Sequence, residues 1–196
     1  MKNLLLAVLA LIVTFTPVEA QSVFVRGGVN FATMGGADAS EAFARRGANF
    51  AVGYVMPMGG VQLDLGLGFS SKGAKFPTTL GDVEFMLKYI EVPLLVRLGG
   101  SAIHADVGPT IGIKSGCAVG VLDITADCDA FDGGVDFSGV DLGLTGGVGT
   151  DFQAGSMIVG LQALYTLGLN SADGTGVEDF KNRAFTIRLG VGFPMN

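Results

Sequence analysis

Residues 61–70, VQLDLGLGFS, decide the fold class of this chain. Apolar residues occupy every second position, namely Val61, Leu63, Leu65, Leu67 and Phe69. Side chains repeat with a period of two in a β-strand and of about 3.6 in an α-helix. The alternation therefore predicts an extended strand with one apolar face, and the same pattern recurs over residues 103–113 and 185–193.

The same alternation predicts eight strands, near residues 23–32, 48–57, 61–71, 84–98, 101–113, 139–152, 156–168 and 183–193. Long loops are expected near residues 33–47, 72–83, 114–138 and 169–182. Strands of about ten residues match the ~9–11 that a tilted strand needs to cross a bilayer. The pattern is typical of an all-β, eight-stranded, antiparallel up-and-down transmembrane β-barrel, with short turns at the periplasmic rim and long loops outside. Pro93 lacks an N–H, so a β-bulge is expected there.

The composition indicates which face of the strands is wet. Hydrophobic residues make up 49% of the 196 residues and charged residues 15%, against the ~25% typical of soluble proteins. The less apolar face carries mainly Gly, Thr, Ser and Asn, and glycine alone supplies 32 residues. An eight-stranded barrel has an interior just wide enough for side chains, so this face is predicted to point inward. The apolar face then meets lipid, which favours a transmembrane barrel over a soluble one.

The start of the chain predicts export. Lys2, an apolar run over residues 4–15 and the small residues around Ala20 are typical of a signal peptide over residues 1–20, followed by a barrel over residues 21–196. The alternative, a membrane anchor, needs about 20 apolar residues, more than this run contains. Cys117 and Cys128 would reach an oxidising compartment, which predicts a disulfide between them rather than two free thiols. The expected location is the outer membrane.

Charged and polar residues on the inward face predict a polar network in the lumen. Its candidate members are Arg26, Asp64, Glu91, Arg97, His104, Asp106, Asp141, Gln162 and Arg188. Opposite charges in a narrow interior must pair to offset their desolvation, so the network is expected to fill the barrel rather than line a conduit. No nucleophile and base cluster around His104, the only histidine, so it is interpreted as a packed interior residue and no catalytic site is predicted.

Two further site classes depend on charged residues. One histidine and two cysteines are too few ligands for a zinc site, so no metal or cofactor is predicted. The acidic loop over residues 123–136 is interpreted as a solvated loop held by the disulfide, and calcium binding there is kept as the alternative. The net charge of −6 argues against a nucleic-acid partner.

Several segments together resemble the PorT-like outer-membrane β-barrel family of Bacteroidota-type bacteria. They are VFVRGGVNFATM (23–34), FSSKGAKF (69–76), LKYIEVPLLVRL (87–98), HADVGPTIGI (104–113) and KNRAFTIRLGVGF (181–193), of which YIEVPLL (89–95) is the most specific. The resemblance implies an eight-stranded outer-membrane barrel without catalytic residues, in a family whose founding member is linked to a secretion system. Unlike barrels that finish on an aromatic residue, this chain continues beyond Phe193 with Pro194-Met195-Asn196.

The leading functional hypothesis is a non-enzymatic integral outer-membrane protein that acts as an envelope scaffold or interaction protein through its long extracellular loops. Its expected partners are outer-membrane lipid, the barrel insertion machinery and an envelope or secretion-system protein. The alternatives are a small porin-like channel for solutes, an accessory component of a secretion system, and a lipid-modifying barrel enzyme.

Overall fold

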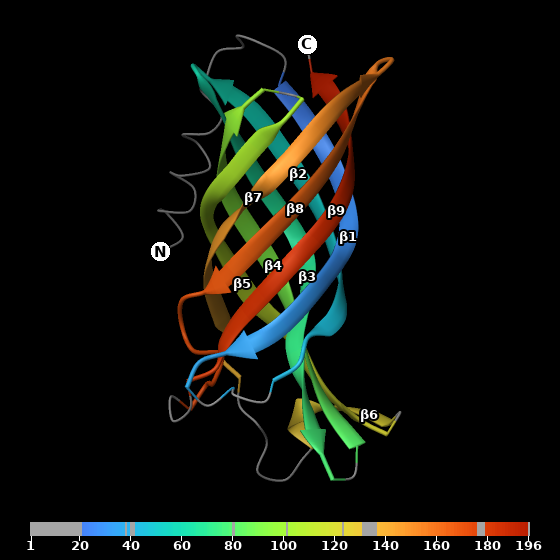
Figure 1. Cartoon of the computed structure of the whole chain (residues 1–196), viewed down its shortest axis with the longest axis vertical. Coiled ribbons are helices and arrows are strands. Elements are labelled where there is room, and N and C mark those ends of the chain that lie inside the picture. The colour runs from blue at the N-terminus through green and yellow to red at the C-terminus, as the bar shows by residue number, and fades with distance from the viewer. Residues whose placement is uncertain are drawn as a thin grey trace.

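The strands of this chain wrap into one cylinder that carries a smaller projection at one end (Figure 1). The computed structural model describes residues 21–195, except 38, 40–41, 80, 101, 123, 131–136 and 176–178. The predicted signal peptide therefore lies outside the described residues. No helix within the described part of the chain is long and apolar enough to cross a membrane.

All strands of the described residues belong to one antiparallel sheet. They are β1 (Gln21–Gly35), β2 (Arg45–Met58), β3 (Val61–Thr78), β4 (Gly81–Gly99), β5 (His104–Val121), β6 (Ile124–Asp127), β7 (Val140–Ala154), β8 (Met157–Gly168) and β9 (Lys181–Met195), with a 3₁₀ turn η1 (Cys128–Ala130) after β6. β9 pairs with β1, and β4 pairs with β5, so the wall has no open edge. Closure satisfies the backbone groups that lipid cannot. The predicted eight-stranded barrel is confirmed, and β6 is an additional short strand on β5.

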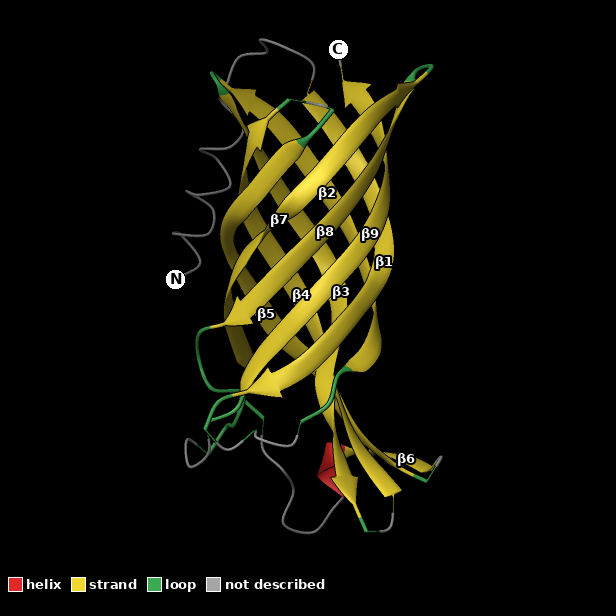
Figure 2. Ribbon diagram, in the orientation of Figure 1, coloured by secondary structure: helices red, strands yellow, loops and turns green. Residues whose placement is uncertain are grey.

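Two of the predicted long loops are wrong in part, because strands continue through them. β3 runs to Thr78 and β4 begins at Gly81, so residues 72–83 form a hairpin rather than a loop. Residues 114–121 extend β5, and β6 pairs back onto it. These strands project beyond the wall (Figure 2). Outside the hydrocarbon the apolar alternation is no longer required, and this segment contains glycine and proline that are typical of loops.

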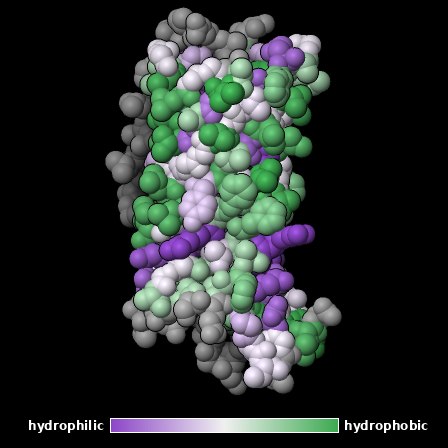
Figure 3. All heavy atoms as spheres, in the orientation of Figure 1, coloured by the Kyte–Doolittle hydropathy of each residue, from purple (hydrophilic) through white to green (hydrophobic). Residues whose placement is uncertain are grey.

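The burial of side chains alternates as the sequence predicts. Val25, Leu67 and Leu189 expose 55%, 59% and 62% of their surface on the outside of the wall. Arg26 and Asp64, on the inward face, expose 3% and 1%. Figure 3 shows hydrophobic side chains over most of the visible wall. Because apolar side chains cover the outside of a closed ladder, the wall is suited to lipid.

The bulge expected at Pro93 is wrong. The pairs Leu65↔Leu94 and Gly68↔Glu91 lie on either side of Pro93 in one unbroken register. A Cβ on Gly66 would lie 2.7 Å from Cγ of Pro93, so the missing side chain of Gly66 makes room for the proline ring. The register shift of β4 against β5 lies instead between Lys88 and Tyr89, where the projection begins.

A small hydrophobic core closes the barrel at the end that bears the long connections. We call it the loop-end core; its buried members are Met34, Ala39, Ala74, Leu87, Tyr89, Val119, Cys128, Phe137 and Ala172. The rings of Phe76 and Phe85 lie 5.8 Å apart at its margin, as do those of Phe85 and Phe137. Strands and connections distant in sequence therefore pack together at this end.

Candidate functional site

The inward side chains form two polar clusters along the axis of the barrel. The first, here called the arginine cluster, consists of Arg26, Asp64, Arg97, His104, Asp106, Asp151, Gln162 and Arg188. The second, called the lysine cluster, consists of Lys72, Tyr89, Glu91, Asp141 and Asn182. Strand parity directs these residues inward, and together they include every residue predicted for the lumen network.

Arg97 on β4 links three carboxylates in the arginine cluster. Its guanidinium lies 3.3 Å from Asp64 Oδ2, 3.1 Å from Asp106 Oδ1 and 2.7 Å from Asp151 Oδ2. Asp64 also pairs with Arg26 through contacts of 2.9 and 2.7 Å. Such bidentate pairs combine charge with fixed geometry, which holds the facing strands in one arrangement.

His104 and Arg188 complete the arginine cluster. His104 Nδ1 lies 3.2 Å from Asp106, and its Nε2 lies 3.7 Å from Asp151. Gln162 donates to Asp106 at 2.8 Å and accepts from Arg188 Nε at 2.8 Å. His104 exposes 1% of its surface and meets carboxylates rather than a nucleophile, so its environment is that of a packed structural histidine.

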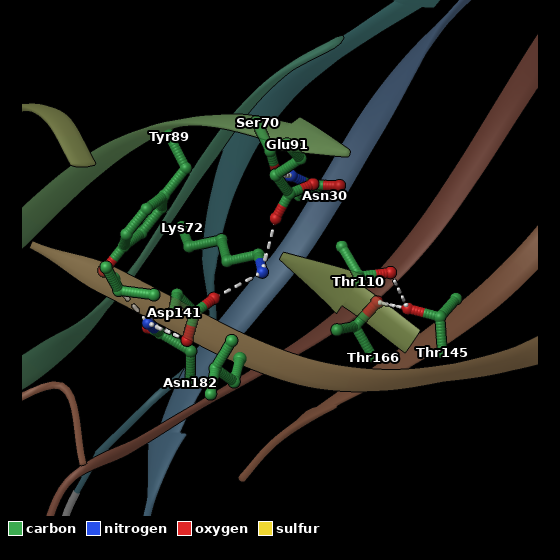
Figure 4. A network of polar contacts seen from close by, with 12 residues as sticks. Asn30, Ser70, Lys72, Tyr89, Glu91, Thr110, Asp141, Thr145, Thr166 and Asn182 are labelled. Carbon is green, nitrogen blue, oxygen red and sulfur yellow. Dashed lines mark hydrogen bonds and ion pairs between the residues drawn. The ribbon is translucent and has the colours of Figure 1, made fainter. Parts of the chain in front are cut away.

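The lysine cluster lies nearer to the projection, and Figure 4 shows Glu91 and Asp141 meeting the Lys72 ammonium from two sides. Lys72 Nζ lies 2.5 Å from Glu91 Oε1 and 2.8 Å from Asp141 Oδ2. Asn182 donates to Asp141 and to the Tyr89 hydroxyl, both at 3.1 Å. One cation thus sits between two acids in a space closed by the Tyr89 ring.

Neutral hydroxyl and amide groups fill the space around these clusters. Thr145 lies 2.8 Å from both Thr110 and Thr166, in a chain of hydroxyl groups across three strands (Figure 4). Asn30 donates to Ser70 at 2.8 Å and accepts from Thr186 at 2.7 Å. These hydroxyl and amide groups therefore bond to one another across the interior of the barrel, as buried polar side chains usually do.

Four members of the two clusters were not predicted from the sequence. Lys72 lies in a segment that the sequence predicts to be a loop, although it has the inward parity of Asp64 and Ser70. Asp151 shares the parity of Asp141 within one strand, and that signal was sufficient to find it. Tyr89 lies beside the register shift of β4, and Asn182 lies at the start of β9. At such positions the alternation of the strand does not predict reliably which side chains point inward.

The projecting strands form a second candidate site at the loop end. We define the projecting sheet as residues 74–78 of β3, 81–87 of β4, 117–121 of β5, and β6. One side of it contributes to the loop-end core. A disulfide joins Cys117 to Cys128 across a Cα–Cα distance of 5.5 Å, so β6 and η1 are tied to β5. Residues 131–136 of the acidic loop, and Asp123, lie outside the described residues, so the solvated loop and its calcium-binding alternative both stay predictions.

A cleft of about 500 Å³ opens on the projecting sheet. It is lined by Lys75, Asp82, Glu84, Met86, Gly120, Val121, Leu122, Ile124 and Thr125. Glu84 accepts from Arg45 at 2.8 Å and lies 3.3 Å from Lys75. Burial opposes ionisation of Glu84, but the hydrogen bonds from Arg45 and Lys75 outweigh it and lower the pKa of this carboxyl below its ordinary value. The cleft therefore combines fixed charges with apolar side chains.

Leu122 at the tip of the projecting sheet has an unusual backbone. Its φ is +46°, in the left-handed region that non-glycine residues rarely adopt. Its side chain is 67% exposed and packs over Gly81, so the tips of the two hairpins touch. Strain of this kind persists where the surrounding structure holds it and is often found at binding sites.

Solved structures of outer-membrane barrels resemble this chain. Neisserial surface protein A aligns with a TM-score of 0.51 and 10% identity over 90% of this chain and 100% of that chain. This likeness supports the fold of the present chain, an outer-membrane β-barrel. Ail of Yersinia pestis, solved with the heparin analogue sucrose octasulfate, gives 0.48 and 13% over 90% and 100%. The outer-membrane enzyme PagL gives 0.33 and 13% over 89% and 99%.

No protein-family model matches the chain, and no curated protein matches it. The fold and the apolar wall nevertheless agree on the environment of the protein. A closed antiparallel cylinder with lipid-facing side chains is the architecture of bacterial outer-membrane barrels. The protein is therefore located in the outer membrane.

Proposed function

We propose that the protein is a non-enzymatic outer-membrane barrel whose projecting sheet binds another protein of the cell envelope. The observation that carries this proposal is the cleft on a disulfide-tied sheet that stands outside the wall. Binding residues commonly lie on the segments that connect the strands, where a rigid barrel holds them in place. The PorT-like family remains our proposed family, and an accessory role in secretion is the narrower form of the proposal.

The free edge of β6 adds a second reason to expect a protein partner. Within the described sheet β6 pairs only with β5, so its other edge offers backbone donors and acceptors. Exposed edges of this kind accept an extended segment of a partner as an added strand. Ile124 is 73% exposed beside that edge and would supply apolar contact.

The test is photo-crosslinking in intact cells. A photoreactive side chain at Thr125 lies in the cleft, whereas one at Phe152, which is 61% exposed on the wall, serves as the matched control. We expect a discrete crosslinked protein from Thr125 and none from Phe152, and loss of that product when Met86→Asp changes the cleft. Identical products from both positions would contradict the proposal.

The filled lumen argues against the channel hypothesis. Both clusters place bonded side chains in the interior, which supports a lumen without a continuous wet path for solutes. Planar-bilayer recordings should show no large steady conductance. A reproducible nanosiemens conductance would favour the small porin-like channel instead.

Export is a separate part of the proposal. We infer that residues 1–20 are removed and that the insertion machinery then assembles residues 21–196. The mass of the protein purified from outer membranes should correspond to a chain that begins at Gln21. A mass that includes residues 1–20 would refute cleavage there.

A further inference from the structure

The basic residues of the wall are unevenly distributed. Arg46 on β2 and Arg183 on β9 point outward and are exposed at the loop end, where the apolar wall stops. They flank β1, because Arg46 pairs with Phe31 and Arg183 pairs with Thr33. In Figure 3 hydrophilic side chains form a narrow zone across the lower part of the wall. The exposed apolar side chains of β1 and β9 end at Phe31 and Phe185, so the two guanidinium groups are expected at the boundary between hydrocarbon and headgroups.

Both guanidinium groups are held against the wall. Arg46 Cζ lies 5.9 Å from the centroid of the Phe31 ring, and the Phe31 and Phe185 rings are 6.5 Å apart. The Arg183 guanidinium lies over Gly35, where an added Cβ would come within 2.3 Å of it. Neither arginine has a carboxylate within ion-pair distance among the described residues. Two preorganised cations thus lack an anion within the described chain.

We infer that Arg46 and Arg183 bind the phosphate groups of a lipid in the outer leaflet, with its acyl chains on the adjacent apolar wall. Long connections mark the outer side of such barrels, so these residues face the outer leaflet. The planar guanidinium fork matches phosphate oxygens in pairs. The two arginines stand two strands apart and two residues offset along β1, roughly 12 Å at the spacings of sheets, which suits a headgroup with two phosphates.

The apolar surface next to the arginines fits the same ligand. Val29, Phe50 and Ile187 expose 42%, 58% and 42% of their surfaces towards the hydrocarbon. A soluble anion would not use this surface, whereas a phosphorylated lipid uses both parts. The site is independent of the projecting sheet and of any protein partner.

The test is native mass spectrometry of the barrel released from phosphatidylcholine nanodiscs that contain a small fraction of diphosphorylated lipid A. We expect the wild-type protein to retain the diphosphorylated lipid. Each Arg→Gln change at these positions should weaken retention roughly fivefold, and R46Q with R183Q about twentyfold. Lipid A lacking one phosphate should bind the wild-type protein more weakly, and millimolar inorganic phosphate should not displace the lipid.

Two variants separate a lipid site from general surface charge. Lys88→Gln removes an exposed cation from β4, outside the strands that carry the arginines, and should leave retention unchanged. Gly35→Ala keeps every charge but displaces the Arg183 guanidinium, so it should reduce retention. Equal retention by R46Q/R183Q and the wild type, an equal loss with Lys88→Gln, or displacement by free phosphate would overturn the inference. Unchanged migration of unboiled samples checks that each variant has folded.

Discussion

Basic residues of the same strand differ widely in how many other strands they contact. Arg97 reaches carboxylates on β3, β5 and β7, whereas Lys88 on the same strand points outward. Removing one partner of a buried ion pair leaves an uncompensated charge, which costs about 3–5 kcal/mol. An exposed cation is solvated without a partner. The stability of the barrel should therefore depend on Arg97 and not on Lys88.

Arg97→Met should lower the free energy of unfolding by about 3–5 kcal/mol, because Asp64, Asp106 and Asp151 lose their shared cation. Lys88→Met is the control and should change it by less than about 0.5 kcal/mol. Urea unfolding of the refolded protein in detergent measures both. Equal effects of the two substitutions would show that Arg97 is not a structural centre of the network.

Neighbouring glycines on β1 provide a second test at this scale. A Cβ on Gly28, which faces inward, would lie 2.1 Å from the Ile187 carbonyl oxygen, and this backbone atom has little freedom to move. A Cβ on Gly27, which faces outward, would lie 3.5 Å from the Phe50 ring, an ordinary contact. Gly28→Ala should therefore destabilise the barrel by about 1–3 kcal/mol, while Gly27→Ala should be nearly neutral in the same urea measurement.

At the scale of elements, the projecting sheet is a separate unit on the barrel. It owes its position to the loop-end core on one side and to the disulfide between β5 and η1. It does not contribute to closure of the wall, which the β1–β9 pairing completes together with residues 90–99 of β4 and 104–113 of β5. Changes in the projecting sheet should therefore alter local order without unfolding the barrel.

Removing the disulfide tests this independence. The double variant Cys117→Ser with Cys128→Ser should destabilise the projecting sheet by about 2–4 kcal/mol, since the unfolded segment regains conformational freedom. Limited proteolysis should then cut within residues 114–138 while the wall stays protected. Proteolysis of the whole barrel, or no new cleavage at all, would contradict a locally acting bridge.

Acid should weaken the same element. The pKa of Glu84 is lower in the folded protein, so its stabilising contribution is present above the ordinary value of 4.5 and is lost as the pH falls through the folded value. Backbone amide signals of the projecting sheet should lose dispersion below about pH 4.5. Glu84→Gln should flatten this dependence, and a wild-type profile unchanged in that variant would exclude Glu84 as its cause.

At the scale of the whole molecule, closure depends on the pairing of the last strand with the first. β9 pairs with β1 over fifteen residues, from Gln21↔Met195 to Gly35↔Lys181. Without β9, the edges of β1 and β8 would face lipid with unpaired backbone groups, each costing several kcal/mol. The chain should therefore tolerate damage to the projecting sheet better than loss of its last strand.

Electrophoresis without boiling tests closure. The intact protein should migrate faster unboiled than boiled, because a closed barrel resists the detergent. Truncation after Gly168, which removes β9, should abolish the fast form. The disulfide double variant should retain it. A fast form that survives truncation would show that the wall does not require β9.

Local sequence pattern is enough to predict the barrel, its inward face and most of the lumen network. Alternation with period two is local, so residues such as Leu67 and Asp64 reveal their faces without any knowledge of partners. The hydrocarbon requires that pattern along the whole wall. Asp151 lies ten positions after Asp141 on the same strand, so the same alternation predicts that it points inward.

Tertiary contacts set which charges pair, where strands continue beyond the membrane, and which wall residues gather at one level. Lys72 meets Glu91 and Asp141 from three different strands, and register between strands sets that meeting. Arg46 and Arg183 are 137 positions apart in the chain and become neighbours across β1 because β9 closes on it. Outside the bilayer a strand need not present a continuous apolar face to lipid, so apolar and polar residues need not alternate there. The projecting sheet therefore forms through packing contacts that a single strand does not encode.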